Sequence, residues 1–407
     1  MAKFNRREFL KQTGALPFCA AFCINSHGAA PKANVSPKCA DPWLEINLDN
    51  MARNLLQIRK RVHPRPVMAV IKANAYGHGL VEVAKFLEKQ HIPFLAVGKL
   101  KEAFELREKG IQTPVLNFGP ISSGESKQIA ARNISQSVYT DDIAALSEAA
   151  GKLKRKARVH IKVDTGLGRV GIPYYLALPY IKKVASLPNI VIEGIFTTLT
   201  EDEEFDKIQL QRFLHLCDLA KKSGINVGLR HAVSSAGILS FARAYLDMVR
   251  PGITLYGHYP SEKEYRERKI DLKPAMALKA RVIQVKNLRP GDAVSYHRKF
   301  TAKNETPVVT LPVGYSDGYP YQIAGKAEAI IHGRRWPVIA AVTANHSTLN
   351  ITGADKIKIG EEAVLIGRQG ESEVTAEEIA GWANTSVYKI VIGMNPQLPK
   401  IYLENSP

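Results

Sequence analysis

The stretch from Pro66 to Val97, PVMAVIKANAYGHGLVEVAKFLEKQHIPFLAV, contains the repeating unit that decides the fold. It begins with an apolar run at Val67–Ile71 and ends with another at Phe94–Val97, and both are short enough to be buried strands. Between them, apolar residues from Leu80 to Leu87 recur on one face of a helix. The stretch therefore predicts a strand, a loop, a helix and a second strand.

The same unit recurs along the chain, because short apolar runs alternate with segments of helical periodicity. Eight such strands over about 190 residues match the count and size of a (β/α)8 barrel. A doubly wound open sheet is the alternative, but eight strands are more than most such sheets use. The expected strands are Val67–Ile71, Phe94–Val97, Val115–Phe118, Gln136–Tyr139, Val159–Val163, Ile190–Phe196, Gly228–His231 and Leu246–Val249.

The pattern changes after Pro274, where short strands are separated by turns such as Arg289–Asp292. The chain is therefore predicted to be α/β, with a TIM-type barrel at 43–272 followed by an all-β domain at 273–407. The first strand, at 43–48, is expected to join the β domain. The expected later strands are Val282–Val285, Val308–Leu311, Ile330–His332, Val338–Val342, Leu349–Ile351 and Ala363–Ile366.

The first 30 residues have the pattern of an export signal. Paired arginines in Arg6–Lys11 precede an apolar stretch at Gly14–Ile24, which is too short to span a bilayer comfortably. The arginine pair is typical of the twin-arginine type, whose pathway carries folded proteins. We therefore expect a signal peptide at 1–30, a linker at 31–42 and a periplasmic mature protein without stable membrane insertion.

The composition of the 407-residue chain is that of an ordinary globular protein, with 45% hydrophobic residues. Its formal net charge is +18, but the basic residues are scattered, so nucleic acid is not an expected partner. Neither an HExxH sequence nor a pair of CxxC motifs occurs, so no metal site is expected. Signal removal would leave Cys39 and Cys217, which can form a disulfide or stay as two free thiols.

A lysine stands at the carboxyl end of the first barrel strand. Burial disfavours the charged form of a lysine and makes its amine a better nucleophile, as Lys72 would be. The loops after strands seven and eight, where barrels commonly bind phosphate, contain Ser234, Ser235 and Gly252. A reactive lysine facing a phosphate seat fits pyridoxal 5'-phosphate (PLP), which binds lysine as a Schiff base.

Six motifs resemble those of the alanine racemase family, whose members are PLP-dependent amino-acid racemases with a barrel and a β domain. They occur in the family's order and extend over nearly the whole mature chain, from Trp43 to Tyr402. The resemblance identifies an exported form of this family. The motifs are Ala69–Gly79 (AVIKANAYGHG), Lys162–Arg169 (KVDTGLGR), Arg250–Gly257 (RPGITLYG), Val294–Tyr296 (VSY), Gly314–Gly318 (GYSDG) and Pro399–Tyr402 (PKIY).

The resemblance implies roles for individual residues. Lys72 matches the PLP-binding lysine and one of two bases, and Tyr296 matches the second base, which the partner subunit supplies in a homodimer with its active sites at the interface. Arg250 matches the arginine that faces the pyridine nitrogen, and Arg169 an arginine near cofactor and substrate. The matches to phosphate-holding positions are Tyr76, Ser235, Gly252, Ile253 and Tyr402.

Other matches concern the substrate, and some depart from the family. Lys162 matches a lysine that is often carbamylated, and Tyr315 matches a tyrosine near the entrance. Thr198 stands where the family usually has histidine. Ala344 and Asn345 replace Met and Asp of a Cys-Met-Asp stretch at the substrate end, so the pocket would be larger and would lack a charge.

The expected activity is conversion of L-alanine to D-alanine by two bases, since racemisation moves the α-proton from one face to the other. The alternatives are a broad-specificity periplasmic racemase of larger or basic amino acids, a non-catalytic PLP carrier, and a PLP decarboxylase on a similar barrel. A GxGxxG motif at Gly166–Gly171 is a weak signal for a dinucleotide site, with Glu193 at the spacing expected for a contact to the ribose.

Overall fold

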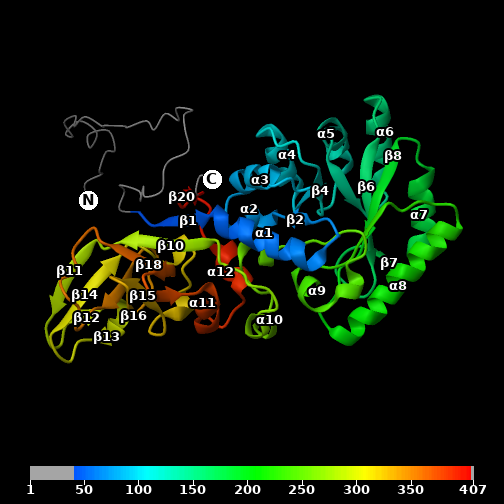
Figure 1. The fold of residues 1–407 in the computed structure, drawn as a ribbon. Helices are drawn as coiled ribbons and strands as arrows, with labels where there is room; N and C mark the ends of the chain where they lie inside the picture. Colours follow the sequence, from blue (N-terminus) through cyan, green and yellow to red (C-terminus); the bar gives the residue numbers. More distant parts are fainter. Residues whose placement is uncertain (1–40, 405–407) are drawn as a thin grey trace, which may run out of the picture. The chain divides into compact units, whose positions relative to one another are not determined.

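The computed structural model of this chain describes residues 41–404 (Figure 1). The predicted signal peptide, most of the predicted linker and Cys39 lie outside these residues. Cys217 is a buried free thiol, and burial raises its pKa to about 12. Among the described helices, none is both long enough and apolar enough to cross a membrane.

A parallel sheet forms the first part of the structure, with strands paired in the order β2-β3-β4-β5-β6-β8-β9 and the two-residue β7 beside β6. Sequential parallel strands joined by helices are the arrangement of a TIM-type barrel, which confirms the predicted fold class. The strands are β2 Met68–Val70, β3 Phe94–Val97, β4 Val115–Asn117, β5 Ser135–Val138, β6 Ala157–Asp164, β7 Ile172–Pro173, β8 Ile190–Phe196 and β9 Leu229–His231.

The eighth predicted strand, Leu246–Val249, is not a regular strand. This segment makes a single parallel bridge, between Val249 and Val67, and its neighbours hydrogen-bond to β2 on one side and β9 on the other. The barrel is therefore closed by irregular backbone. Pro251 and Pro66 explain the irregularity, because proline has no N–H to extend a ladder of hydrogen bonds.

Helices lie between the barrel strands and bury the faces that their apolar spacing predicts. In α3, Leu80, Val83, Ala84 and Leu87 are all buried. α1 begins where the Asn47 side chain accepts a hydrogen bond from the Asn50 N–H at 2.8 Å. The helices are α1 Leu48–Val62, α2 Lys72–Tyr76, α3 Leu80–Lys89, α4 Leu100–Glu108, α5 Ser126–Ala131, α6 Ile143–Lys152, α7 Ala177–Ser186, α8 Glu203–Lys222, α9 Ser235–Ser240 and α10 Glu262–Glu267.

The second part is a mainly antiparallel sheet with the order β11-β14-β17-β16-β15-β18-β10-β1-β20. β1 lies between β10 and β20, so the beginning and the end of the described chain meet in this sheet. Two short strands, β12 Ala293–Val294 and β13 Phe300–Thr301, pair with each other in a separate sheet, and β19 Ser372–Val374 pairs with β18. The other strands are β1 Trp43–Asn47, β10 Met276–Arg281, β11 Gln284–Leu288, β14 Thr306–Leu311, β15 Glu328–Ile331, β16 Arg334–Ile339, β17 Ser347–Asn350, β18 Glu362–Gln369 and β20 Lys400–Leu403.

Two helices, α11 Ala376–Trp382 and α12 Val387–Gly393, interrupt this sheet domain, which was predicted to be all-β. Both are only seven residues long, so they give the sequence little periodicity to detect. α12 packs against α2, and a Cβ added at Gly77 would lie 2.1 Å from the Val391 carbonyl oxygen. The second domain therefore reaches the loop that follows the first barrel strand.

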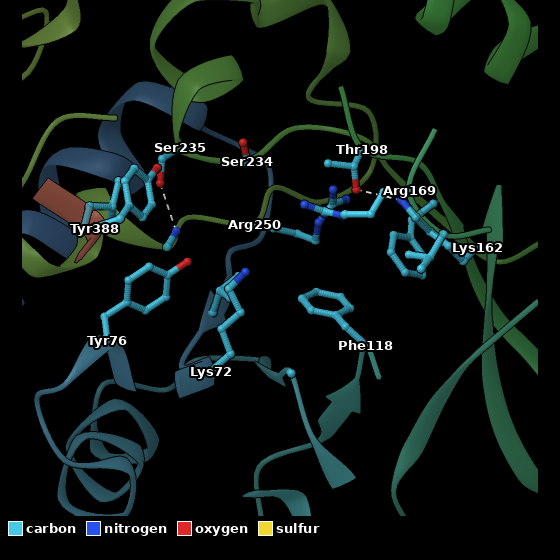
Figure 2. A pocket seen from close by; sticks show the side chains of 16 residues that line it. Lys72, Tyr76, Phe118, Lys162, Arg169, Thr198, Ser234, Ser235, Arg250 and Tyr388 are labelled. Atoms are coloured by element: carbon cyan, nitrogen blue, oxygen red, sulfur yellow. Dashed lines mark hydrogen bonds between the residues drawn. The ribbon is translucent and has the colours of Figure 1, made fainter. Parts of the chain in front are cut away.

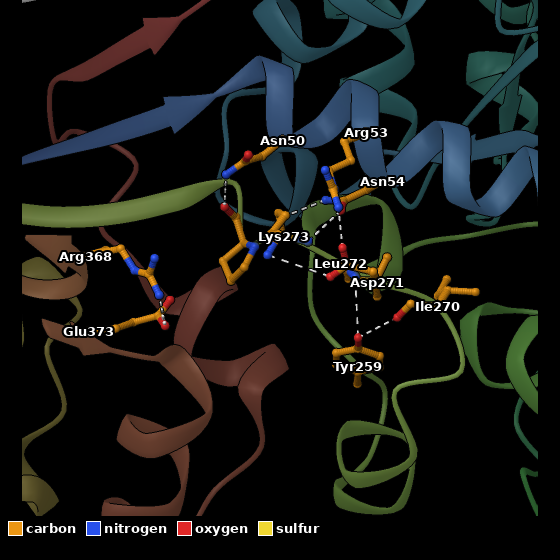
Figure 3. A network of polar contacts seen from close by, with 11 residues as sticks. Asn50, Arg53, Asn54, Tyr259, Ile270, Asp271, Leu272, Lys273, Arg368 and Glu373 are labelled. Carbon is orange, nitrogen blue, oxygen red and sulfur yellow. Dashed lines mark hydrogen bonds and ion pairs between the residues drawn. The ribbon is translucent and has the colours of Figure 1, made fainter. Parts of the chain in front are cut away.

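The segment that connects the barrel to the sheet domain is held by polar contacts from α1 (Figure 3). The buried Asn54 side chain donates to the Lys273 carbonyl and accepts from the Lys273 N–H, both at 2.8 Å. Asn50 donates to the Pro274 carbonyl at 2.8 Å, and Arg53 forms an ion pair with Asp271. These contacts provide hydrogen-bond partners for backbone groups in the connecting segment, which has no neighbouring strand to pair with.

Substituting Gly77 tests this close packing. Gly77→Ala should lower the free energy of unfolding by about 2 kcal/mol more than Gly110→Ala, because overpacking costs roughly 1–3 kcal/mol. Both glycines have left-handed φ angles, +85° and +82°, but nothing lies within 4 Å of a Cβ at Gly110. Urea unfolding of both variants gives the difference, and equal losses would show that α12 does not press on this loop.

Candidate active site

A cavity of about 380 Å³ lies at the carboxyl ends of the barrel strands (Figure 2). Four cationic side chains line it, Lys72, Lys162, Arg169 and Arg250, and no carboxylate is among its described lining residues. Such an uneven charge favours an anionic ligand. The other lining residues are Val70, Tyr76, Gly98, Phe118, Val170, Phe196, Thr198, Ser234, Ser235, Gly252, Ile253 and Tyr388.

Lys72 is followed by a left-handed turn. Ala73, Asn74, Ala75 and Tyr76 have φ angles between 52° and 56°, although none is glycine. Left-handed helical conformation costs L-residues about 1–2 kcal/mol each, so a run of four requires support from its surroundings. The turn reverses the chain within a few residues, and both Lys72 and Tyr76 line the cavity as a result.

Side chains from three places support this turn. The Glu102 carboxylate accepts from the Asn74 N–H at 3.1 Å, and the Asn74 side chain accepts from the Leu80 N–H at 2.9 Å. The buried His78 donates from Nδ1 toward the carbonyls of Ala75 and Tyr76, at 3.1 and 2.9 Å. His78 thus has a structural role in the glycine-rich loop.

The Lys72 amine has a lowered pKa. Burial is the main cause, the positive charge of Arg169 adds to it, and Glu102 opposes it. More of the amine is therefore neutral near pH 7 than in an exposed lysine, as a nucleophile requires.

The phosphate seat predicted after strands seven and eight is a compact group of small residues. Ser235 Oγ accepts from the Gly252 N–H at 3.0 Å, and a Cβ at Gly252 would lie 2.5 Å from the Tyr76 hydroxyl. Only glycine, which has no Cβ, avoids a clash with the Tyr76 hydroxyl at this position. Hydroxyls and backbone N–H groups of this kind suit a phosphate, and Ile253 lines the same end of the cavity.

Tyr402, which the resemblance places at the phosphate, does not line this cavity. Its hydroxyl donates instead to the His78 carbonyl at 3.1 Å, because β20 ends beside the glycine-rich loop. Tyr388 of α12 lines the cavity, with its ring centroid 6.2 Å from that of Tyr76. Tyr388 is not among the residues predicted from the sequence, because a lone tyrosine in a short helix carries no periodic or motif signal.

Arg250 is buried, and its donors are held in fixed directions. Its Nη2 donates to the carbonyls of Thr197 and Ala232, and its Nη1 donates to His231 Nδ1, each at 2.8 Å. Burial lowers the pKa of Arg250 to about 9. The two remaining N–H donors make no hydrogen bond within the described residues, so a cavity ligand can accept them.

Lys162 is buried at the side of the cavity. Its Nζ donates to Thr198 Oγ1 at 2.6 Å and lies 4.6 Å from the centre of the Phe196 ring. Burial, and then the charges of Arg250 and Arg169, put the pKa of Lys162 well below its usual value. Thr198, found where the family usually has histidine, therefore provides the acceptor for this amine.

The other predicted site residues form a second group on the sheet domain. Tyr296, Tyr315, Ala344 and Asn345 line a separate cavity of about 420 Å³, which shares no lining residue with the first. Tyr296 is 76% exposed and follows Ser295, whose φ is +69°. A single chain therefore does not bring Lys72 and Tyr296 into one pocket.

The fold and the first cavity define a class of enzyme, a barrel with a half-buried lysine in a cationic cavity that suits an anionic ligand. The model of the alanine racemase N-terminal domain matches residues 46–260, and that of the C-terminal domain matches residues 275–402. This chain belongs to the alanine racemase family. It is an isomerase, an amino-acid racemase that depends on PLP.

Relatives of known sequence or structure agree. Alanine racemase 1 of Clostridium acetobutylicum is 38% identical over 371 residues, which cover 89% of this chain and 95% of the relative. The alanine racemase structure of Clostridium difficile has a TM-score of 0.85 at 34% identity and covers 90% of this chain and 97% of its own. A histidine racemase of Leuconostoc mesenteroides has a TM-score of 0.81 at 26% identity and covers 91% of this chain and 100% of its own.

The residues of the first cavity fit PLP. Lys72 offers the amine, Arg250 offers free N–H donors, and Ser235 with Gly252 offers a small polar seat that a Cβ would fill. Phe118 and Phe196 provide flat apolar walls between the cationic groups. The charged donors are all cationic, which suits a phosphorylated aromatic ligand.

Ser235→Ala should raise the PLP dissociation constant of the apoprotein about tenfold, since one hydrogen bond to a charged group is worth roughly 1.5 kcal/mol. Ser240→Ala is the control, because Ser240 ends the same helix and only donates to the Ala236 carbonyl at 2.8 Å. Quenching of protein fluorescence by PLP measures both constants. Equal affinities in the two variants would show that the phosphate does not bind here.

Proposed function

We propose that this protein interconverts L- and D-alanine by a two-base mechanism, with Lys72 and Tyr296 of the partner subunit as the bases. The observation that carries the proposal is the Lys72 amine, which has a lowered pKa in a cavity lined by cations and by no described carboxylate. The curated relatives, which are alanine racemases, support alanine as the substrate.

PLP, when bound, withdraws electrons from the α-carbon of an amino acid and makes its α-proton acidic. Lys72 Nζ would accept or return this proton on one side, and the phenol of Tyr296 of the partner subunit would do so on the other. Arg250 keeps its proton near pH 7 even with a pKa lowered to about 9, so it would donate to the ring nitrogen and leave that nitrogen unprotonated. Such a contact would limit electron withdrawal and discourage side reactions such as transamination.

The two bases require two chains. In one chain, Tyr296 lies in the sheet-domain cavity and Lys72 in the barrel cavity. The family is generally dimeric, and a two-fold dimer would place each sheet domain at the partner's barrel. Exposed aromatic residues support an interface at both places, with Tyr296 and Tyr315 on the sheet domain and Tyr175 on the barrel.

Mixing two inactive variants tests the shared site. Lys72→Ala and Tyr296→Phe should each lose racemisation, but chains co-expressed at equal levels should regain about a quarter of the wild-type activity. Half of the dimers are then mixed, and each mixed dimer has one intact site of two. Chiral chromatography of alanine measures the activity. No recovery in dimers shown to be mixed would contradict bases on different chains.

A second candidate function, racemisation of larger or basic amino acids, is supported by the sheet-domain cavity. Ala344 and Asn345 both line it, so a short side chain and a neutral amide are present where the family usually has Met and Asp. The Asn345 amide donates to Ser316 Oγ at 2.8 Å and carries no charge toward a substrate. The similar histidine racemase supports a larger substrate for this fold.

A panel of alanine, serine, methionine, lysine and arginine separates the two candidates. We expect alanine to have the highest kcat/KM; a higher value for lysine or arginine would establish the second candidate instead. Ala344→Met should lower kcat/KM for methionine and lysine about tenfold, because overpacking costs roughly 1–3 kcal/mol, and should leave alanine within about twofold. Thr348→Val on β17, which does not line the cavity, is the control.

Carbamylation of Lys162 stays a prediction of the resemblance. Arg169 and Arg250 both lower the pKa of this buried lysine, so an anionic carbamate at the same place would be attracted by both. Thr198 Oγ1 already accepts from the free amine, and it therefore offers an alternative arrangement without the modification.

We propose that the protein is exported folded, with PLP already bound, and in the periplasm releases D-amino acids for cell-wall editing or processes scavenged ones. The paired arginines at Arg6 and Arg7 support this route. Arg6→Lys with Arg7→Lys should retain the protein in the cytoplasm, whereas Lys3→Gln should not. Cell fractionation measures the distribution, and equal distributions would contradict a twin-arginine route.

A further inference from the structure

A chain of buried polar side chains leads from the cavity through the inside of the barrel. It begins at Arg250, continues through His231 of β9 and His160 of β6, and ends at Glu193 of β8. His231 and His160 are fully buried, and the Glu193 side chain is 17% exposed. The chain therefore links the guanidinium at the cavity to a carboxylate near the surface.

The guanidinium determines where each proton of this chain lies. Arginine has no acceptor, so His231 Nδ1 must accept from Arg250 at 2.8 Å. A neutral His231 then carries its proton on Nε2 and donates to His160 Nδ1 at 2.9 Å. His160 in turn donates from Nε2 to the Glu193 carboxylate at 3.2 Å.

Both histidines are neutral, and both are held by packing. Burial lowers the pKa of His160 and puts the pKa of His231 well below its usual value, with the charge of Arg250 adding to both effects. Phe196 stacks on His231 with ring centroids 4.9 Å apart and planes at 4°. A Cβ at Gly194 would lie 2.4 Å from His160 Nδ1, so the β8 glycine makes room for this ring.

The outer end of the chain is an ionised carboxylate. Burial alone would raise the pKa of Glu193, but hydrogen bonds from His160 and Ser135 lower it overall. Ser135 Oγ donates to Glu193 at 2.5 Å, and Arg158 Nε lies 3.7 Å from the carboxylate. A fixed negative charge therefore lies at one end of the chain of hydrogen bonds, and the Arg250 guanidinium lies at the other end.

We propose that Glu193 and His160 are positioning residues for Arg250, which act through His231 and keep the arginine's remaining N–H donors directed at the cavity. Because the carboxylate accepts only, it fixes one proton arrangement along both histidines. Without it, the histidines can exchange tautomers and Arg250 loses a defined acceptor. The last step, the effect on the ring nitrogen of PLP, rests on the proposed function.

The chain has a matched control pair. His258 Nδ1 lies 2.7 Å from Glu377, with side-chain exposures of 1% and 16%, close to the 0% and 17% of His160 and Glu193. Neither residue of this control pair lines the barrel cavity. Glu193→Leu and Glu377→Leu should therefore cost similar thermal stability, and only Glu193→Leu should affect Arg250.

The first measurement is ¹⁵N NMR of the apoprotein with labelled histidine, which reports the tautomer of each ring without PLP. We expect His231 and His160 to be protonated on Nε2 in the wild type, in Glu193→Gln and in Glu377→Leu, and a second tautomer to appear in Glu193→Leu. Glutamine retains the tautomer because its amide oxygen can replace the lost acceptor. A different tautomer in the wild type, or no change in Glu193→Leu, would overturn the proposal.

The second measurement uses holoenzyme prepared with PLP labelled with ¹⁵N in the ring. In Glu193→Leu the ring-nitrogen shift should change, and the pyridoxamine phosphate and keto acid formed per racemisation turnover should rise about tenfold. Equal amounts of pyridoxamine phosphate per racemisation turnover in Glu193→Leu and Glu377→Leu would overturn the proposal. If Glu193→Leu does not fold, the proposal is tested by the histidine tautomers of the wild type and by the amount of pyridoxamine phosphate that Glu193→Gln forms per racemisation turnover. Correct tautomers in a wild-type protein that does not bind PLP would contradict the proposed function alone.

Discussion

The burial of two cationic side chains beside one cavity, Lys162 and Arg250, is the constraint on which much of the surrounding structure depends. An uncompensated buried charge is expensive, and no carboxylate among the described lining residues is present to compensate it. The structure uses neutral acceptors instead. Two backbone carbonyls and His231 accept from Arg250, and Thr198 accepts from Lys162. The positive charge is thereby kept available for an anionic cofactor.

The position of Lys72 depends on a local conformation that the local sequence disfavours. Four consecutive non-glycine residues after it are left-handed, and their stability comes from Glu102 of α4, from the buried His78 and from the closeness of α12. Tyr402 of β20 binds the same loop through the His78 carbonyl. Lys72 is thus positioned by elements from both domains.

The two cavities divide the chemistry between different parts of the molecule. The barrel cavity can hold the cofactor and one base, and the sheet domain carries the second predicted base in an exposed position. Under the proposed two-base mechanism, association of two chains would complete the active site, because neither cavity of one chain contains both predicted bases. Ala344 and Asn345, the predicted substrate residues that differ from the family, line a different cavity from the predicted phosphate seat.

The sequence by itself determined the features that depend on local patterns. Periodicity identified the barrel strands and the buried face of α3, and the motif around Lys72 predicted a reactive lysine at the position where the structure places a cavity-lining amine of lowered pKa. The irregular eighth strand and the helices α11 and α12 followed from tertiary packing, because their short segments have no sustained period. Only the tertiary structure shows that Tyr388, and not Tyr402, lines the cavity. Only the tertiary structure shows that hydrogen bonds through two histidines connect Glu193 to Arg250. These contacts join residues far apart in the chain, and hydrogen-bond geometry between distant residues leaves no mark on local spacing.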